Sequence, residues 1–288
     1  MTALEQTRTR TDLFPMLSTF KTYLDFSAKL RHYVRNPVTE HAAWQVLTRQ
    51  LKQRQENFLK LLRSSVFEYP KSPYRVLFNW AEVTFEDVES MLQQRGLEKT
   101  LEALYEQGIY VTFEEFKARR PIRRGKKAFS PAESDFDNPN LDPVIVGSSG
   151  GSSGPATRSK MDLGHIAQAA KEFNLALAAH DVLDAPLLTW WGLLPDPMGL
   201  AFGLRSAHFG KTVERWFATH TRNESNAGWR YVVMTYLVIL MARIHGHKIP
   251  LPERVSLEHS LPVVKALEAN LKKHGKVLLV TTVSKCMR

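Results

Sequence analysis

The chain has 288 residues, of which 43% are hydrophobic and 24% charged, and its net charge at pH 7 is +10. At roughly 150 residues per domain, this length predicts about two domains or subdomains, with ample chain for a buried core. The single cysteine, Cys286, excludes an intrachain disulfide framework and a cysteine-ligated metal cluster.

The sequence carries no sign of export or membrane insertion. Residues 1–14 contain no apolar core of signal-peptide length, and the longest apolar run, residues 231–242, is too short to cross a bilayer. We therefore expect a cytoplasmic protein with no membrane partner.

The positive charge does not form the continuous stripe that is typical of nucleic-acid-binding proteins. Its densest cluster consists of Lys117, Arg119, Arg120, Arg123, Arg124, Lys126 and Lys127. The acidic residues that follow this cluster closely are Glu133, Asp135, Asp137 and Asp142. Zinc-finger, RNP and basic-zipper signatures are absent, so we expect a solvated basic rim and no nucleic-acid partner.

The first half of the chain carries mainly helical patterns. Residues 1–13 are polar and are expected to be disordered. Between residues 39 and 66, apolar side chains recur every three or four positions and predict one long amphipathic helix. Thr84 with Asp87, and Thr112 with Glu115, are spaced as capping boxes and predict two further helix starts. Residues 14–140 are therefore expected to form a mainly helical region.

The composition changes to Pro, Ser, Asp and Asn between residues 120 and 143, which predicts a boundary. From residue 141 to residue 288 we expect a first α/β subdomain. It opens with an apolar strand at residues 144–146, a Gly/Ser loop and a helix over residues 161–179. The elements expected after that are a buried helix or strand at residues 231–245, a helix at 261–274 and a strand at 277–283.

This order predicts an α/β fold, in which a helical N-terminal region is followed by an incomplete, mostly parallel sheet flanked by helices. The alternative is an α+β arrangement with antiparallel strands. The last strand is followed only by SKCMR, as in a domain cut before completion.

The Gly/Ser loop offers backbone N–H groups and hydroxyls to one point, which is the chemistry of phosphate binding. Its candidate ligand-binding residues are Ser148, Ser149, Gly150, Gly151, Ser152, Ser153, Gly154, Thr157 and Arg158. The arginine would meet phosphate charge.

Two other interpretations of this loop remain open. GSSGGSSG is also typical of a flexible linker. The sequence G-x-S-x-G within it fits a nucleophile elbow with Ser149 as the nucleophile of a serine hydrolase. The bases considered for that hydrolase are His245, His247, His259 and His274. A Walker loop is excluded because no lysine follows the glycines.

The segment VGSSGGSSGPATRS resembles the phosphate loop of adenylate-forming enzymes, the acyl-CoA synthetase and phenylacetate-CoA ligase group, whose pattern is [ST]-S-G-[ST]-[ST]-G-x-P-[KT]. The preceding stretch from SPYRVLFNW to ARRPIRRG is similar to the same region of phenylacetate-CoA ligase-like proteins, so the resemblance covers about residues 40–288. Two positions depart from the pattern: Ser153 stands where it has glycine, and Ala156 or Thr157 stands where many members carry lysine or threonine.

The resemblance implies ATP-dependent activation of a carboxylate through an acyl-adenylate, with ATP and Mg²⁺ bound and a thiol such as CoA as acceptor. The family's residues for adenine, ribose, magnesium and the catalytic lysine lie beyond the first α/β subdomain, and none is matched here. The resemblance therefore implies the N-terminal portion of such a ligase, from a truncated gene or a split protein, inactive until completed. Self-association or a complementing C-terminal chain is expected, and a non-catalytic scaffold remnant is the further alternative.

The resemblance also places walls of an acyl pocket in the apolar stretch around residues 187–210. The aromatic and histidine residues concerned are Trp190, Trp191, Phe202, His208 and Phe209. Core packing is the competing role for most of these side chains. The His245-Gly-His247 pair lacks a carboxylate or cysteine spaced to complete a metal site.

Overall fold

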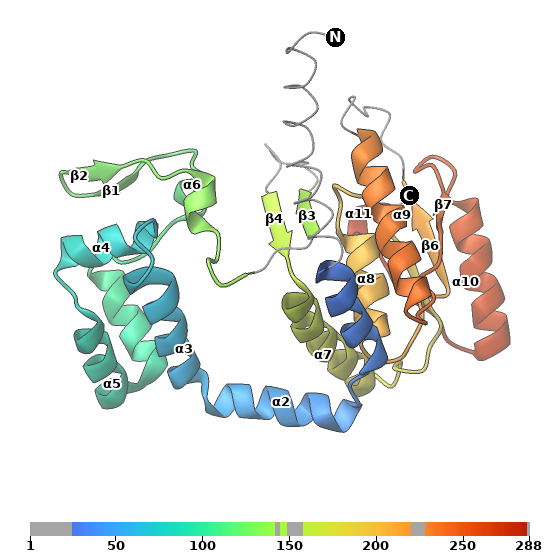
Figure 1. Ribbon diagram of the computed structural model, residues 1–288, viewed down its shortest axis with the longest axis horizontal. Helices are drawn as coiled ribbons and strands as arrows, with labels where there is room; N and C mark the ends of the chain where they lie inside the picture. Colours follow the sequence, from blue (N-terminus) through green and yellow to red (C-terminus); the bar gives the residue numbers. More distant parts are fainter. Residues whose placement is uncertain (1–24, 142–144, 149–157, 220–227, 287–288) are drawn as a thin grey trace, which may run out of the picture. The chain divides into compact units, whose positions relative to one another are not determined.

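The computed structural model describes residues 25–141, 145–148, 158–219 and 228–286 (Figure 1). The chain divides into two compact units, here named the helical unit, Gln45–Asp142, and the sheet unit, Met1–Trp44 with Pro143–Arg288. The expected boundary near residue 140 lies beside this division. The segment expected to be disordered, residues 1–13, lies outside the described residues.

The helical unit is built from short helices and one small hairpin. Its elements are α2 (Glu40–Lys52, which spans the division), α3 (Arg54–Leu62), the π turn η1 (Arg63–Phe67), α4 (Pro73–Ala81), α5 (Phe85–Glu106), α6 (Phe113–Phe116), β1 (Ile122–Arg124), β2 (Lys127–Phe129) and the 3₁₀ turn η2 (Glu133–Phe136). Strands β1 and β2 pair antiparallel. Leu77, Phe78, Val88 and Ile122 lie at the centre of its core.

Both predicted capping boxes are confirmed. The Thr84 hydroxyl accepts a hydrogen bond from the Asp87 N–H at the start of α5, and Thr112 does the same with Glu115 at the start of α6. In each case the carboxylate in turn accepts a hydrogen bond from the backbone N–H of the threonine, so two otherwise unpaired donors are satisfied.

The prediction of one continuous helix over residues 39–66 is wrong, because the helix is broken. The chain leaves helical geometry at Gln53, with φ −95° and ψ 16°, and the last turn is π-helical. In α2 only Ala43 is buried, so no continuous core holds α2 and α3 in one line.

The sheet unit contains four parallel strands in the order β7-β6-β5-β8. Its elements in chain order are β5 (Leu187–Trp190), α8 (Met198–Ala207), β6 (Arg215–Ala218), α9 (Gly228–Ile244), β7 (Pro252–Arg254), α10 (Leu261–His274), β8 (Leu278–Val280) and α11 (Val283–Cys286). This arrangement confirms the predicted α/β class with a parallel sheet flanked by helices.

The two faces of the sheet bury different helices (Figure 1). Trp216 of β6 belongs to the cluster formed by α8 and α9, whereas its neighbour Phe217 packs with Val263 and Ala266 of α10. This alternation is the two-residue period of a strand that is covered on both sides. The close packing of α8 depends on Gly199, where an added Cβ would lie 2.3 Å from the Trp216 ring.

A helix over residues 25–35 belongs to the sheet unit although it precedes the helical unit in the chain. Phe26, Leu30 and Tyr33 are buried in the cluster of α8 and α9. The Tyr33 hydroxyl donates to the Leu204 carbonyl at 3.1 Å, which fixes the helix on α8.

The sequence predicted that the Gly/Ser segment would connect a strand directly to a helix, and this prediction is wrong. Strand β3 (Ile145–Ser148) pairs antiparallel with β4 (Arg158–Met161), and only then does α7 (Leu163–Ala179) begin. The Asp162 carboxylate accepts from the His165 N–H at 2.6 Å and caps α7. The sequence RSKM of β4 has no alternation of apolar and polar residues, so it does not predict a strand.

Among the described residues, no helix combines the length and the apolar character needed to cross a bilayer. This holds also for the apolar helix α9, which has 17 residues.

Candidate functional site

The order of the strands creates a switch point beside β5. The chain runs from β5 through β6 to β7 on one side, and then returns through α10 to place β8 on the other side of β5. The strand order reverses between β5 and β8, and open α/β sheets bind ligands outside the carboxyl ends of the strands at such a reversal. The region outside the carboxyl ends of β5 and β8 is therefore the expected ligand crevice.

The carbonyl of Trp190, at the end of β5, is held by two groups that follow β8. The Thr281 hydroxyl and the Lys285 amine each donate a hydrogen bond to this oxygen at 3.0 Å. The Lys285 Nζ also lies 5.9 Å and 5.4 Å from the ring centroids of Trp190 and Trp191. The crevice thus contains one half-buried cation in an aromatic setting.

Burial lowers the pKa of the Lys285 amine from its ordinary value, and the Asp196 carboxylate opposes this shift. Asp196 itself organises the loop after β5: its carboxylate oxygens accept from the Gly192 N–H at 3.0 Å and the Met198 N–H at 3.1 Å. The loop is therefore closed by its own hydrogen bonds.

The ring nitrogens of Trp190 and Trp191 have no hydrogen-bond partner within the described part of the chain, although both are buried. The Trp191 carbonyl, by contrast, accepts from the Trp216 ring nitrogen at 3.0 Å. Both unpaired ring nitrogens are inaccessible to solvent, and Trp190 packs in the core with Leu188 and Phe217, so these two donors are buried without a partner among the described residues.

The β3–β4 hairpin lies directly against this loop. A Cβ added at Gly147 would lie 2.7 Å from Pro197 Cγ and 2.8 Å from the Pro195 carbonyl oxygen. Only a glycine permits this close approach without displacing the backbone. The Gly/Ser segment therefore leaves the end of β3 next to the loop that follows β5.

The predicted phosphate-binding residues fall mainly outside what the structure describes. Ser148 is the last residue of β3 and Arg158 the first of β4, and the two are paired in register. The remaining candidates, Ser149, Gly150, Gly151, Ser152, Ser153, Gly154 and Thr157, lie outside the described residues.

The predicted pocket walls separate into two groups. Trp190 and Trp191 follow one another at the end of β5. The Trp190 ring packs in the core beside Phe217 and Val263, as the competing role predicted. Phe202 of α8 stacks near Trp191 with ring centroids 6.3 Å apart. His208 and Phe209 follow the far end of α8, whose ten residues rise about 15 Å from the loop. The structure therefore does not bring His208 and Phe209 to the crevice.

His208 is a buried, neutral core residue. Its ring stacks on Tyr33 at 4.8 Å, and both ring nitrogens lack a partner within the described ranges. Burial, with a smaller contribution from the Lys171 charge, lowers the pKa of His208 to about 4.

No group of three His, Cys, Asp or Glu side chains among the described residues could hold a metal ion. His245 instead shares a 2.9 Å hydrogen bond with Ser27, and burial lowers the pKa of His247.

Sequence reasoning missed Lys285, Thr281 and Asp196. No motif marks them, because parallel pairing of β5 with β8 is what brings residues 95 positions apart into contact. Comparisons of the chain with protein-family models, with curated proteins and with solved structures gave no match.

Proposed function

We propose that this chain provides the phosphate-binding part of an adenylate-forming ligase, which activates a carboxylate with ATP and transfers the acyl group to a thiol such as CoA. The observation that carries the proposal is the contact of Gly147 with Pro195 and Pro197. It places the end of β3, the last described position before the Gly/Ser segment, beside the loop that follows β5. The carboxyl end of β5 is where an α/β sheet of this topology is expected to bind a ligand.

The polar groups of the crevice support an anionic ligand. The Lys285 amine is half-buried and donates a hydrogen bond to the Trp190 carbonyl. A phosphate oxygen could take the place of this carbonyl and would accept a stronger hydrogen bond, because both partners would be charged. The closed loop around Asp196 keeps these groups in place before a ligand arrives.

In the proposed first reaction a carboxylate oxygen attacks the α-phosphorus of ATP, the bond from that phosphorus to the bridging oxygen breaks, and pyrophosphate leaves. In the second, a thiolate attacks the acyl carbon and AMP leaves. The chain's own contribution is to hold the departing pyrophosphate with Lys285 and the Gly/Ser segment, which lowers the energy of the charged transition state. Mg²⁺, carried by the phosphates, would neutralise further charge.

The family's residues for adenine, ribose and magnesium, and its catalytic lysine, are not matched in this sequence. We therefore propose that turnover requires a complementing C-terminal chain. The edges of the parallel sheet offer places for such pairing or for self-association, because among the described strands β7 and β8 each have one neighbour.

The hydrolase alternative is less well supported. A nucleophile elbow needs a sharp turn from a strand into a helix, whereas β3 continues into the antiparallel strand β4. A fluorophosphonate probe distinguishes the two: stoichiometric labelling of Ser149 would favour the hydrolase over the ligase.

The direct test is calorimetric titration of the chain with ATP and Mg²⁺, and then with pyrophosphate. Wild-type protein should bind both, and Lys285→Met should weaken both by roughly tenfold or more, the value of one charge-assisted hydrogen bond. Lys272→Met, an exposed lysine of α10, is the matched control and should bind normally. Absence of any heat or thermal shift at millimolar nucleotide would overturn the proposal.

A further inference from the structure

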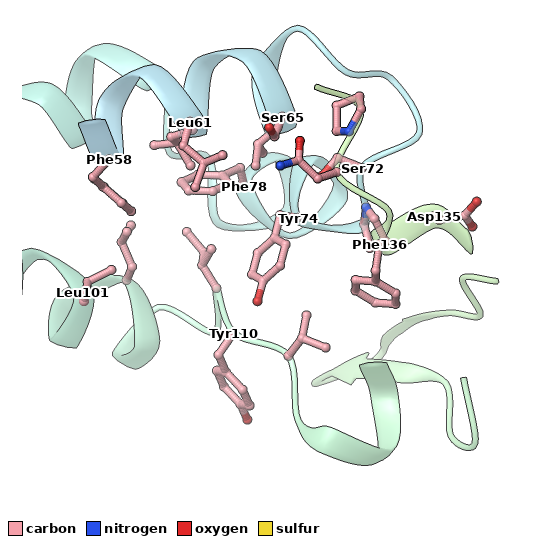
Figure 2. Close-up of a pocket in the computed structure, with 18 of the residues that line it drawn as sticks. Phe58, Leu61, Ser65, Ser72, Tyr74, Phe78, Leu101, Tyr110, Asp135 and Phe136 are labelled. Atoms are coloured by element: carbon pink, nitrogen blue, oxygen red, sulfur yellow. The ribbon is translucent and has the colours of Figure 1, made fainter. Parts of the chain in front are cut away.

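The helical unit contains a pocket of about 570 Å³ that the ligase chemistry does not use. It lies between α3, α4 and the end of α5, and is closed on its other sides by residues 109–111 and 135–139 (Figure 2). Its volume is within the range of small-molecule sites, and so is its lining of mostly aliphatic and aromatic side chains.

The mouth of the pocket exposes large apolar side chains. Leu61 and Leu101 are 52% and 46% exposed, and Figure 2 shows them on different helices that line the pocket, with Phe58 on the same side of the view. Phe78 lies at the back and is buried. An apolar ligand would cover the leucines and so gain hydrophobic stabilisation.

One polar group stands out inside. The Tyr74 hydroxyl projects toward the middle of the pocket (Figure 2) and has no hydrogen-bond partner within the described part of the chain. Burial raises the pKa of Tyr74, against an opposing effect of Arg124, so the phenol remains a neutral donor. The Ser65 hydroxyl, by contrast, already accepts from the Asn140 side chain at 3.0 Å.

The charges around the pocket disfavour an anion. None of the lining residues is basic, and Asp135 and Asp137 lie on one rim. Arg124, a cation beside the lining residue Tyr110, lies over that ring at 3.9 Å and is paired with Glu115 at 2.9 Å. A carboxylate or phosphate entering the pocket would meet no compensating charge.

We propose that this pocket binds a neutral, mainly apolar compound, aromatic or medium-chain alkyl, that carries one oxygen able to accept a hydrogen bond from Tyr74. The site is separate from the nucleotide crevice of the proposed function and is independent of it. The carboxylate substrate of that function is excluded here by charge.

The probe for the test is 6-propionyl-2-dimethylaminonaphthalene, a neutral naphthalene with one ketone, whose emission shifts to the blue in an apolar site. We expect saturable binding in the micromolar range. Leu61→Trp should fill the mouth and weaken binding at least tenfold, while Leu51→Trp, at a 71% exposed leucine outside the pocket, should leave it unchanged.

Tyr74→Phe should weaken binding of the ketone roughly 2- to 10-fold, the value of one net hydrogen bond. It should leave N-phenyl-1-naphthylamine, which has no such oxygen, unaffected. Equal binding of the ketone by wild type and Leu61→Trp, or tighter binding of anionic anilinonaphthalene sulfonate than of the ketone, would overturn the proposal. So would a Leu61→Trp protein that changes oligomeric state but not probe binding, because the pocket would then be a protein contact.

Lys285→Met and saturating ATP should not alter binding of the ketone. This control separates the two proposals, since either site can then fail its test while the other passes.

Discussion

The Nζ of Lys285 donates to the main-chain oxygen of Trp190 at 3.0 Å, across 95 residues of sequence. Because burial lowers the pKa of this amine, a larger fraction is neutral at mildly alkaline pH than for an exposed lysine. We expect the pH midpoint of its acetylation, followed by mass spectrometry, to lie below the ordinary range of a lysine amine. Pyrophosphate should protect Lys285 and not Lys272; equal protection of both would argue against an anion at the crevice.

Gly147 tests the contact between the hairpin and the loop after β5. Gly147→Val places methyl groups where Pro195 and Pro197 already lie, and should cost about 1–3 kcal/mol of unfolding free energy as well as nucleotide binding. Gly164→Ala, in the first turn of α7, meets only the Asp162 side chain and serves as the control. Chemical denaturation measures the unfolding free energy and calorimetry measures nucleotide binding. Unchanged binding in Gly147→Val would show that the β3–β4 hairpin does not contribute to the nucleotide site.

His208 should make stability depend on pH. Its pKa is about 4 in the folded protein and near 6.5 when exposed, so the unfolded chain binds the extra proton between these values. This contribution is complete above pH 6.5 and is lost as the pH falls toward 4, by up to about 3 kcal/mol.

The comparison is between wild type and His208→Phe, which keeps an aromatic ring against Tyr33. Denaturant unfolding between pH 4 and 7 should show a shallower slope for the variant, because carboxylates elsewhere titrate equally in both proteins.

Arg124 should be essential for the helical unit. It donates to Glu115 at 2.9 Å and to the Gly108 carbonyl at 2.8 Å, and the Glu115 side chain is 9% exposed. Arg124→Met leaves a buried carboxylate unpaired and should cost about 3 kcal/mol, whereas exposed Arg123→Met should cost little.

The pH dependence gives a second reading of that variant. Burial alone would raise the pKa of Glu115, but hydrogen bonds from Arg124 and Thr112 lower it overall, so in wild type its contribution is present at neutral pH and lost in acid. Without Arg124 the pKa of the Glu115 carboxyl rises, so in Arg124→Met this group takes up a proton at a higher pH than in wild type. The loss of unfolding free energy relative to wild type should therefore be smaller at pH 5 than at pH 7.

Local chemistry predicted the elements whose signals are local. The Thr84 and Thr112 caps and the helix over residues 261–274 match the structure because a hydroxyl, a carboxylate and a periodic apolar face act within a few residues. Strand β4 was missed because RSKM is defined by its pairing with β3 and not by an apolar alternation.

The candidate site was only partly predictable for the same reason. The glycines and serines of the loop are recognisable in sequence, whereas Lys285 becomes a site residue only when β8 is placed beside β5. The pocket of the helical unit likewise joins side chains of α3, α4 and α5 with residues 109–139, and no spacing rule connects them.

The sheet unit is interrupted in sequence, and this has a consequence for synthesis on the ribosome. The helix of residues 25–35 is made first, but its hydrogen-bond partner Leu204 follows Tyr33 by 171 residues. Meanwhile the whole of the helical unit emerges as one continuous segment and can fold by itself. The apolar side chains of Phe26 and Leu30 therefore stay exposed until α8 and α9, against which they pack, have been made. During this time the nascent helix is a target for chaperones that shield apolar side chains.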